Sequence, residues 1–448
     1  MFKIRSSKYR HVYCDPPKPE QIHTGFRLST VTGDQQYIKA SARYYVVALS
    51  GGGGPMHVGR LDRPGRFEVG TSQQVEGHTG AILDFDFNPF DDSMFASASE
   101  DCTIKLWSIP EDWEPTDTKG TAKSGKNLTE SIVDLTAHKK RVTLLNFHPS
   151  AANVLGSTSA DCTVKVWDVE MAEEISSFND FNDMIQDIIW DLRGDAIATS
   201  CKDKMIRYLD PRSGKVSSVI QTPHDGLKTV KLAYLGDSGK FLTTGASRNN
   251  AREVKIWDLK NLSSPLSTEA IDTASGALLP LFDADTNLLF LCGKGDGIIR
   301  PYEFENAEPF LHKMNDGFRS TVPAKGLCLV PKRGLNVMDC ETARILKLTN
   351  NEGVHPLSWT VPRKADGFQD DLFPDCAAPS PAHTAAEWAA GSSKAPLTMS
   401  LNPVMRNGSN GTKKTMLKSA SSIAADLDKA QDRIKYLEHL LKYHGIQY

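Results

Sequence analysis

The 448-residue chain lacks long apolar runs and closely spaced cysteine pairs. No run of about 18 apolar residues is present, which argues against a membrane-spanning helix. The eight cysteines are scattered without a C-x-x-C pair, so their spacing favours neither a zinc site nor a disulfide framework. The first residues, MFKIRSSKYRHV, are charged and lack the apolar segment of a secretory signal. We therefore expect a cytoplasmic protein with reduced thiols.

Catalytic and cofactor-binding motifs are also missing. The sequence contains no H-E-x-x-H, no G-x-S-x-G and no clustered metal ligands. The glycine run at 51–54 lacks the Lys-Ser/Thr of a phosphate-binding loop and indicates a tight turn. No nucleic-acid recognition motif occurs, and membrane contact is unsupported. We therefore predict that the protein is not an enzyme, carries no cofactor or metal and has no nucleic-acid partner.

Charge is distributed unevenly along the chain, whose formal net charge is only −3. Residues 1–27 carry six basic and two acidic side chains, and residues 402–420 carry four basic side chains and no acidic ones. Basic segments of this kind attract acidic partners over long distances. The composition as a whole, with 40% hydrophobic and 24% charged residues, is typical of a soluble globular protein with a large core.

Two segments of the chain repeat each other without a gap. The first runs from His78 through SASEDCTIKLW to Trp107, and the second runs from His138 through STSADCTVKVW to Trp167. In both segments an Asp follows the His after 23 positions, and the Trp follows that Asp after six. The stretches TIKLW and TVKVW alternate polar and apolar residues, which is typical of a half-buried β-strand. The two aspartates are Asp101 and Asp161.

Weaker copies of the pattern end at Leu209, Trp257 and Tyr302. Counted from Trp107, the successive end positions are 60, 42, 48 and 45 residues apart, and three of these intervals lie near the period of roughly 40–45 residues of propeller blades. The longest interval contains a polar stretch at 111–131, which indicates a surface insertion. One more blade fits before these repeats and one after them. We therefore predict an all-β fold, a seven-bladed WD-repeat β-propeller.

The His and Asp of each strong repeat, together with nearby serines, are residue types that also form a hydrolase triad. Catalysis needs one site, whereas two copies in register favour a structural network in which buried polar groups satisfy one another. Cys102 and Cys162 occupy equivalent positions and are expected to be packed thiols. We assign six residues to this structural blade network: His78, Asp101, Trp107, His138, Asp161 and Trp167.

Segments outside the strong repeats resemble the coronin family. Five blocks in order carry the resemblance, which covers residues 1 to about 400. They are RSSKYRHVY at 5–13, DTASGALLPLFDADTNLLFLCGKGDGIIRPYE at 272–303, KGLCLVPKRGLNV at 325–337, VPRKADGFQDDLFPD at 361–375 and TAAEWAAG at 384–391.

The resemblance implies a propeller at 1–358 whose last blade is completed by the N-terminal segment. It further implies a C-terminal extension packed on the propeller at 359–400, a flexible basic linker at 401–421 and a coiled coil at 422–448. The family binds the sides of actin filaments, bundles them and regulates branching and severing, so filamentous actin and regulators of branching and severing are the implied partners.

By alignment with the family, the arginine important for filament binding falls on Arg27, in GFRLSTV. The basic residues nearest the N-terminus are weaker candidates for the same contact, because blade packing must occupy some of them. These are Lys3, Arg5, Lys8 and Arg10.

The C-terminal 50 or so residues change character twice. Residues 396–420 are rich in Gly, Ser, Asn, Thr and Pro without a period, as in a flexible linker. The linker lysines Lys413, Lys414 and Lys418 offer a second contact with acidic actin, one that salt should weaken. From residue 422 onward, apolar residues recur at spacings of four and three, which is a heptad seam.

Three heptads make a helix that is marginal alone, so partner helices explain the seam best. The alternative is that the helix docks on its own propeller. RIKYLE at 433–438 matches a pattern associated with trimeric coils, so we favour a parallel trimer over a dimer or tetramer. Several propellers on flexible linkers would bind filaments with avidity and join them. The assigned oligomerisation residues are Leu427, Ala430, Arg433, Ile434, Leu437, Glu438 and Leu441.

The predicted function is therefore that of a cytoskeletal actin-filament binder and cross-linker that regulates actin dynamics and cell motility. The main alternative is a WD-repeat adaptor that presents substrates to an enzyme complex. Removal of the coil distinguishes the two, because it should abolish bundling by the first while leaving partner recognition by the second intact.

Overall fold

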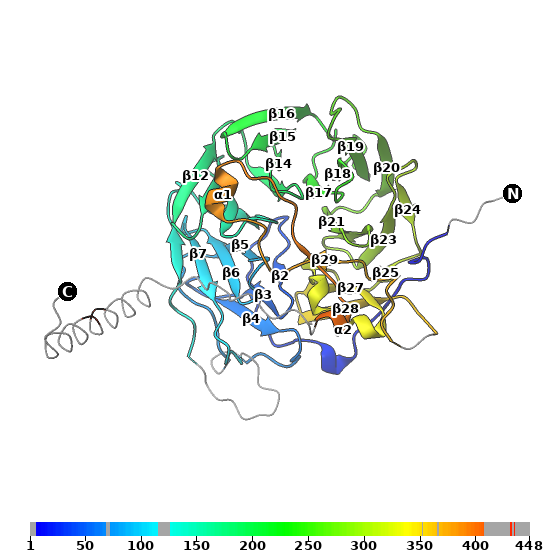
Figure 1. Cartoon of the computed structure of the whole chain (residues 1–448), viewed down its shortest axis with the longest axis horizontal. Coiled ribbons are helices and arrows are strands. Elements are labelled where there is room, and N and C mark those ends of the chain that lie inside the picture. The colour runs from blue at the N-terminus through cyan, green and yellow to red at the C-terminus, as the bar shows by residue number, and fades with distance from the viewer. Residues whose placement is uncertain are drawn as a thin grey trace, which may run out of the picture.

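The computed structural model of the chain describes residues 6–68, 72–114, 126–351, 353–364 and 367–406, together with Gln431 and Ile434. Within these residues, seven antiparallel sheets stand around a common axis like the blades of a propeller (Figure 1). The prediction of a seven-bladed β-propeller is confirmed. Of the linker predicted at 401–421 the structure describes residues 401–406, and of the coiled coil predicted at 422–448 it describes Gln431 and Ile434.

The blades follow one another in sequence, and their strands are as follows. The first blade contains β2 (Ile38–Ala40), β3 (Tyr44–Ala48) and β4 (Met56–Arg60). The second blade contains β5 (Ile82–Phe87), β6 (Met94–Ser99), β7 (Ile104–Ser108) and β8 (Val133–Leu135). The third blade contains β9 (Val142–Phe147), β10 (Val154–Ser159), β11 (Val164–Asp168) and β12 (Glu173–Phe178). The fourth contains β13 (Ile185–Trp190), β14 (Ile197–Cys201), β15 (Met205–Asp210) and β16 (Lys215–Gln221), and the fifth contains β17 (Lys231–Tyr234), β18 (Lys240–Ala246), β19 (Arg252–Asp258) and β20 (Ser267–Asp272). The sixth contains β21 (Leu278–Asp283), β22 (Leu288–Gly293), β23 (Ile298–Phe304), β24 (Leu311–Lys313) and β25 (Phe318–Arg319), and the seventh contains β26 (Gly326–Leu329), β27 (Glu341–Thr349), β28 (Gly353–Thr360) and β1 (Tyr13–Asp15).

The five positions that mark the repeat in the sequence all fall in the third strand of a blade. Their side chains are buried, because each projects from its sheet against an adjacent blade. Over the residues that the structure describes, the hydrophobic core is accordingly divided into seven clusters, each of which joins two neighbouring blades. This arrangement explains why the sequence repeats once per blade. A single blade leaves both of its apolar faces uncovered, and only a closed ring of blades buries all of these faces.

The ring is closed by the N-terminal segment. Strand β1 pairs with β28 along the outer edge of the seventh blade, with Cys14 opposite Trp359. Just before this strand, Tyr9 and Val12 are buried in the cluster between the sixth and seventh blades. The closing strand begins at Tyr13, the last residue of the block RSSKYRHVY, and Tyr9 and Val12 before it contribute packing rather than strand pairing.

After β28 the chain forms a strap, residues 367–406, which crosses one face of the ring. It contains β29 (Cys376–Ala377), α1 (Ala385–Ala389), β30 (Thr398–Met399) and α2 (Pro403–Arg406), and β29 pairs with β30. Its ends pack between the sixth and seventh blades, whereas α1 packs between the third and fourth blades (Figure 1). The three short 3-10 helices found in the described residues lie elsewhere, at Pro19–Gln21, Lys332–Gly334 and Val337–Asp339.

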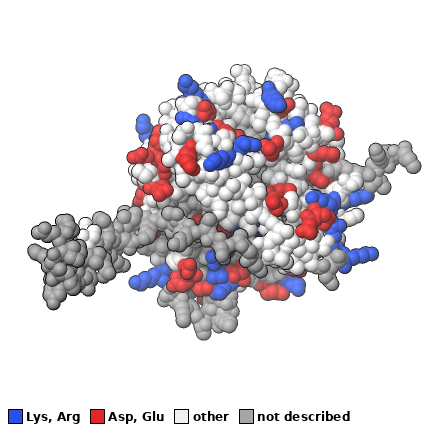
Figure 2. All heavy atoms as spheres, in the orientation of Figure 1, with Lys and Arg blue, Asp and Glu red and all other residues white. Residues whose placement is uncertain are grey.

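The two faces of the ring differ in which connections they carry. The strap contacts the turns between the first and second strands of blades, for example at Ser150 and Gly194, and this side is called the strap face. The connections into each first strand and the turns between second and third strands lie at the other ends of the strands, on what is called the upper face. On the strap face, acidic and basic side chains lie close together around the rim (Figure 2).

None of the helices in the described part of the chain has both the length and the apolar character needed to cross a membrane.

Candidate functional site

The second blade contains a chain of buried hydrogen bonds that ends at Asp101. The Trp107 indole Nε1 donates to Ser97 Oγ at 2.8 Å, and Ser97 Oγ lies 2.7 Å from His78 Nε2. On the other side of the ring, His78 Nδ1 lies 2.8 Å from Asp101 Oδ2. With the His78 proton on Nδ1, each donor in this chain has an acceptor, so a neutral imidazole satisfies the whole network.

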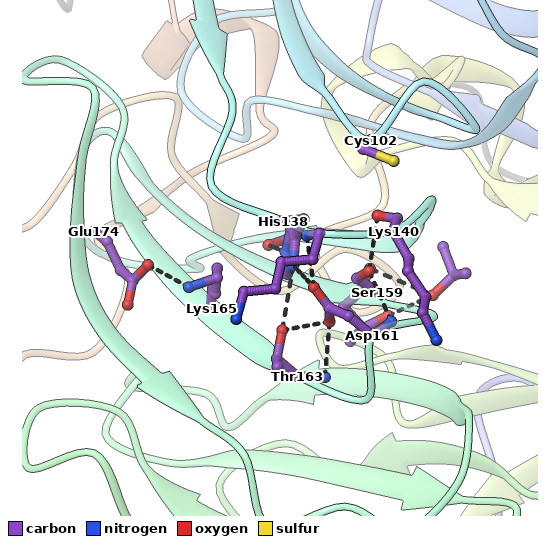
Figure 3. A network of polar contacts seen from close by, with 12 residues as sticks. Cys102, His138, Lys140, Ser159, Asp161, Thr163, Lys165 and Glu174 are labelled. Atoms are coloured by element: carbon purple, nitrogen blue, oxygen red, sulfur yellow. Dashed lines mark hydrogen bonds and ion pairs between the residues drawn. The ribbon is translucent and has the colours of Figure 1, made fainter.

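The third blade repeats the arrangement. Trp167 Nε1 donates to Ser157 Oγ at 2.8 Å, His138 Nε2 lies 2.8 Å from the same oxygen, and His138 Nδ1 lies 3.3 Å from Asp161 Oδ2. Figure 3 shows Asp161 at the centre of the network, between His138 and Thr163. The structure therefore brings together, blade by blade, the six residues that the sequence assigned to a structural network.

Electrostatics keeps these networks in one protonation state. Burial lowers the pKa of His78 and of His138, so both are neutral near pH 7. Burial opposes ionisation of Asp101, but hydrogen bonds from Thr103, from the Thr79 amide and from His78 outweigh it and lower the pKa of Asp101 to about 2. The carboxylate can thus accept all of these bonds at once.

The order Asp, His, Ser matches that of a hydrolase triad, but the surroundings differ. Ser97 and Ser157 are both 0% exposed, and in each case a buried tryptophan donates to the serine oxygen. A substrate carbonyl cannot reach either oxygen, so these groups are suited to holding strands in register rather than to attack on a bound molecule.

A third network of this kind was missed by sequence analysis. In the fifth blade, His224 lies 2.8 Å from Glu253 Oε1 and 2.8 Å from Thr243 Oγ1, and Trp257 Nε1 donates to the same threonine oxygen at 3.0 Å. One signal was available, because the hydroxyl residue follows the histidine after 19 positions in all three blades. In the fifth blade the Trp follows the hydroxyl residue after 14 positions rather than 10, and Glu replaces Asp. These two differences hid the network from the sequence comparison.

The sequence led us to expect Cys102 and Cys162 to be packed thiols, but both are partly exposed. Each follows the network aspartate in the turn between the second and third strands, with φ of 69° and 63° respectively. The turn geometry directs both residues toward the edge of the upper face, which explains why they are only half-buried.

Arg27 lies on the upper face, in the segment that leads into the first blade, and it is exposed. It lines an open groove of about 710 Å³ between that segment and the turns of the sixth and seventh blades. Lys8 and Arg10 are also exposed, but they lie beside β1 at the outer edge of the seventh blade, so they do not join Arg27 in this groove. Lys3 and Arg5 lie outside the described residues.

Of the predicted oligomerisation residues, the structure describes only Ile434, which is helical and 54% exposed. Leu427, Ala430, Arg433, Leu437, Glu438 and Leu441 lie outside the described residues, as do the linker lysines Lys413, Lys414 and Lys418.

Three family models match four parts of the chain. The WD domain, G-beta repeat, matches residues 70–108 and 129–168, which contain the two strong networks. A type of WD40 repeat matches residues 354–396, which hold β28 and most of the strap, and a domain of unknown function (DUF1899) matches residues 2–66.

Sequence comparisons with individual proteins cover nearly the whole chain. Coronin-2A from Homo sapiens is 38% identical over 408 residues, which are 90% of this chain and 75% of that protein. The coronin-like protein crn1 from Schizosaccharomyces pombe is 36% identical over 395 residues, 88% of this chain and 64% of that protein.

Solved structures agree with the sequence comparisons. The crystal structure of the WD40 domain from Toxoplasma gondii coronin superposes with a TM-score of 0.82 at 33% identity, covering 89% of this chain and 99% of that one. A chain of the mitotic checkpoint complex, with a TM-score of 0.56 at 13% identity over 81% of this chain and 98% of that one, shares the fold alone. The chain therefore belongs to the coronin family of WD-repeat propeller proteins.

Proposed function

We propose that this coronin binds the sides of actin filaments through the upper face of its propeller and regulates filament dynamics in the cytoplasm. The observation that carries the proposal is the position of Arg27, the residue aligned with the filament-binding arginine of the family. It is exposed at a groove on the face that the strap leaves uncovered, where a large partner has access. An arginine in such a position suits contact with carboxylates on an acidic protein surface.

We further propose that the C-terminal segment makes the protein a cross-linker. The heptad seam at residues 423–441 would assemble several chains, and the linker lysines Lys413, Lys414 and Lys418 would add a salt-sensitive contact with the filament. Several propellers on one assembly raise the effective concentration of the second and third sites, which allows bundling. Regulators of branching and severing are further proposed partners.

Co-sedimentation with actin filaments tests the proposal. Full-length protein should pellet with filaments at high speed and should bundle them into a low-speed pellet. A chain that ends after Arg406 retains the strap, so it should bind filaments without bundling them. Loss of bundling without loss of binding separates the two activities.

Point variants test the role of Arg27 in the same assay. Charge reversal in Arg27→Asp should weaken filament binding by roughly tenfold or more, because it replaces an attractive contact with a repulsive one. Arg193→Asp is the matched control, since Arg193 is also exposed but lies in the turn between β13 and β14 on the strap face. Failure of the full-length chain to pellet at low salt would contradict the proposed function.

A further inference from the structure

We propose that the groove beside Arg27 is a binding site for an acidic polypeptide segment, with Lys294 and Lys325 as its principal charged contacts. This inference rests on the proposed function in assuming that the segment belongs to the filament. The lysines are brought to the groove by the fold, from the turn between β22 and β23 and from the connection into β26.

The two lysines are fixed in position by the aromatic ring of Tyr37. Lys294 Nζ lies 4.2 Å from the ring centroid and Lys325 Nζ lies 5.6 Å from it. Lys294 also donates to the carbonyl oxygens of Gly33 and Gln35, and Lys325 donates to that of Ser29. Cation–π and backbone contacts of this kind hold two ammonium groups close together before any ligand arrives.

The positive charge of the groove is not neutralised by the described residues that line it. Arg27, Lys294 and Lys325 face a single carboxylate, that of Asp34, so the formal charge is +2. Asp34 itself accepts a hydrogen bond from Thr229. Among the described residues, no ion pair joins an acidic side chain to any of the three cations. A concave surface with uncompensated charge attracts ligands of the opposite sign.

The pKa values of both groove lysines are lowered, as expected of ammonium groups that lack a full anionic partner. Burial, helped by the nearby charges of Lys231 and Lys325 and opposed by Asp34, lowers the pKa of Lys294 to about 8. Burial also lowers the pKa of Lys325. An anionic group in the groove would stabilise both charged forms.

The shape and lining of the groove favour a peptide over a small ion. Its volume of about 710 Å³ lies within the range of roughly 300–1,000 Å³ typical of ligand sites and far exceeds the size of one phosphate group. Partly exposed apolar side chains from Phe26, Leu28 and Val31 form one wall. A segment that combines carboxylates with apolar side chains matches both the charge and this wall.

The side chain of Tyr37 gives the groove a second polar feature. Its hydroxyl is buried, and within the described part of the chain it has no hydrogen-bond partner. Buried hydroxyls are usually paired, so a water that enters with the ligand would complete the hydrogen bonding of Tyr37.

The test compares two double variants of the full-length chain in filament co-sedimentation. Lys294→Gln with Lys325→Gln removes both charges but keeps a hydrogen-bond donor at each position. Lys215→Gln with Lys260→Gln is the matched control, because these exposed lysines lie where the third strand connects to the fourth in the fourth and fifth blades, on the strap face and away from the proposed filament contact. The groove variant should lose roughly tenfold or more in affinity with a shallower salt dependence, and the control should stay within about twofold. Lys294→Arg with Lys325→Arg should restore binding, and thermal unfolding should verify that all variants are folded.

A second probe separates failure of the groove from failure of the proposed function. A fluorescein-labelled peptide of alternating glutamate and leucine is titrated into each protein and followed by anisotropy. If wild-type protein pellets with filaments and the groove variant binds them equally well, the inference is overturned while the proposed function stands. If wild-type protein does not pellet with filaments, peptide binding distinguishes the remaining outcomes. Peptide binding by the wild-type protein that the groove variant loses supports a site for an acidic segment of another protein. Equal peptide binding by both proteins, or no peptide binding, overturns the proposed site. Binding to vesicles that contain phosphatidylinositol bisphosphate, with no binding of filaments or peptide, would also overturn it in favour of a membrane ligand.

Discussion

The strap should contribute directly to the stability of the ring through Trp388. This side chain is 0% exposed in the cluster between the third and fourth blades. Its Nε1 donates to the Gly194 carbonyl at 3.0 Å, and its ring lies edge-on to His148 and Trp190 with centroid distances of 5.0 and 5.8 Å. Arg212 lies over the same ring at 5.0 Å and donates to the Trp388 carbonyl at 2.8 Å.

Trp388→Ala removes a fully buried aromatic side chain and leaves a cavity between two blades. Such changes cost about 3–5 kcal/mol, and the fully buried position places this one toward the upper end. Unfolding entropy of about 2.1 cal/mol/K per residue gives roughly 0.84 kcal/mol/K for about 400 folded residues, so the expected fall in Tm is about 4–6 °C. Because the contact joins the strap to the ring, amides of α1 should lose hydrogen-exchange protection before the rest of the molecule.

Differential scanning calorimetry and hydrogen exchange on the full-length chain measure both effects. Trp388→Phe keeps a large ring but loses the indole donor, so it should cost less than the alanine variant. Leu397→Ala is the control on the same strap, since Leu397 is 48% exposed and its loss should change stability by less than about 0.5 kcal/mol. An unchanged Tm for Trp388→Ala would refute the idea that the strap stabilises the ring.

Three further predictions concern the interior of the propeller. Ser157→Ala removes the acceptor for Trp167 and the donor to His138, so urea unfolding should show a loss of about 1–3 kcal/mol, and wild-type stability would contradict the structural role of the network. Arg252→Met leaves the carboxylates that Arg252 binds at 2.6 and 2.8 Å without their buried partner and should cost about 3–5 kcal/mol in the same assay; a neutral effect would show that the pair is dispensable. Burial lowers the pKa of three histidines to about 3 or 4, below the ordinary histidine pKa near 6.5. Between these two pKa values the unfolded chain binds more protons than the folded chain, so stability should fall as the pH drops from 7 to 5, by up to roughly 1.4 kcal/mol per pH unit for each histidine. Equal urea midpoints at pH 7 and pH 5 would contradict this prediction. These histidines are His23, His57 and His148.

The sequence predicted the blades because blade residues recur locally. His, Asp and Trp fall within about 30 residues of one another in the second and third blades, so their spacing could be compared directly. The blade that ends at Trp257 was found as a weaker copy, but its hydrogen-bond network escaped because Glu253 replaces the Asp and the Trp is displaced by four positions, although the bonds in space are equivalent. Tertiary structure tolerates such changes when the turn between two strands lengthens, whereas a pattern of fixed spacing does not.

Contacts between distant segments were not predictable from local pattern. The block TAAEWAAG was recognised, but the partners of its Trp388 lie 176 and 194 residues earlier, at Arg212 and Gly194. Likewise, the lysines of the groove lie 261 and 296 residues from the backbone carbonyls that they bind. No periodicity relates such positions, and only closure of the ring brings them together.

Electron cryomicroscopy of filaments decorated with the full-length chain would show which face of the propeller meets actin. We expect the upper face, with Arg27 and the lysines of the groove, to contact the side of the filament while the strap faces away from it. Density that places the strap face or the outer edges of the blades against the filament would refute filament binding through the upper face.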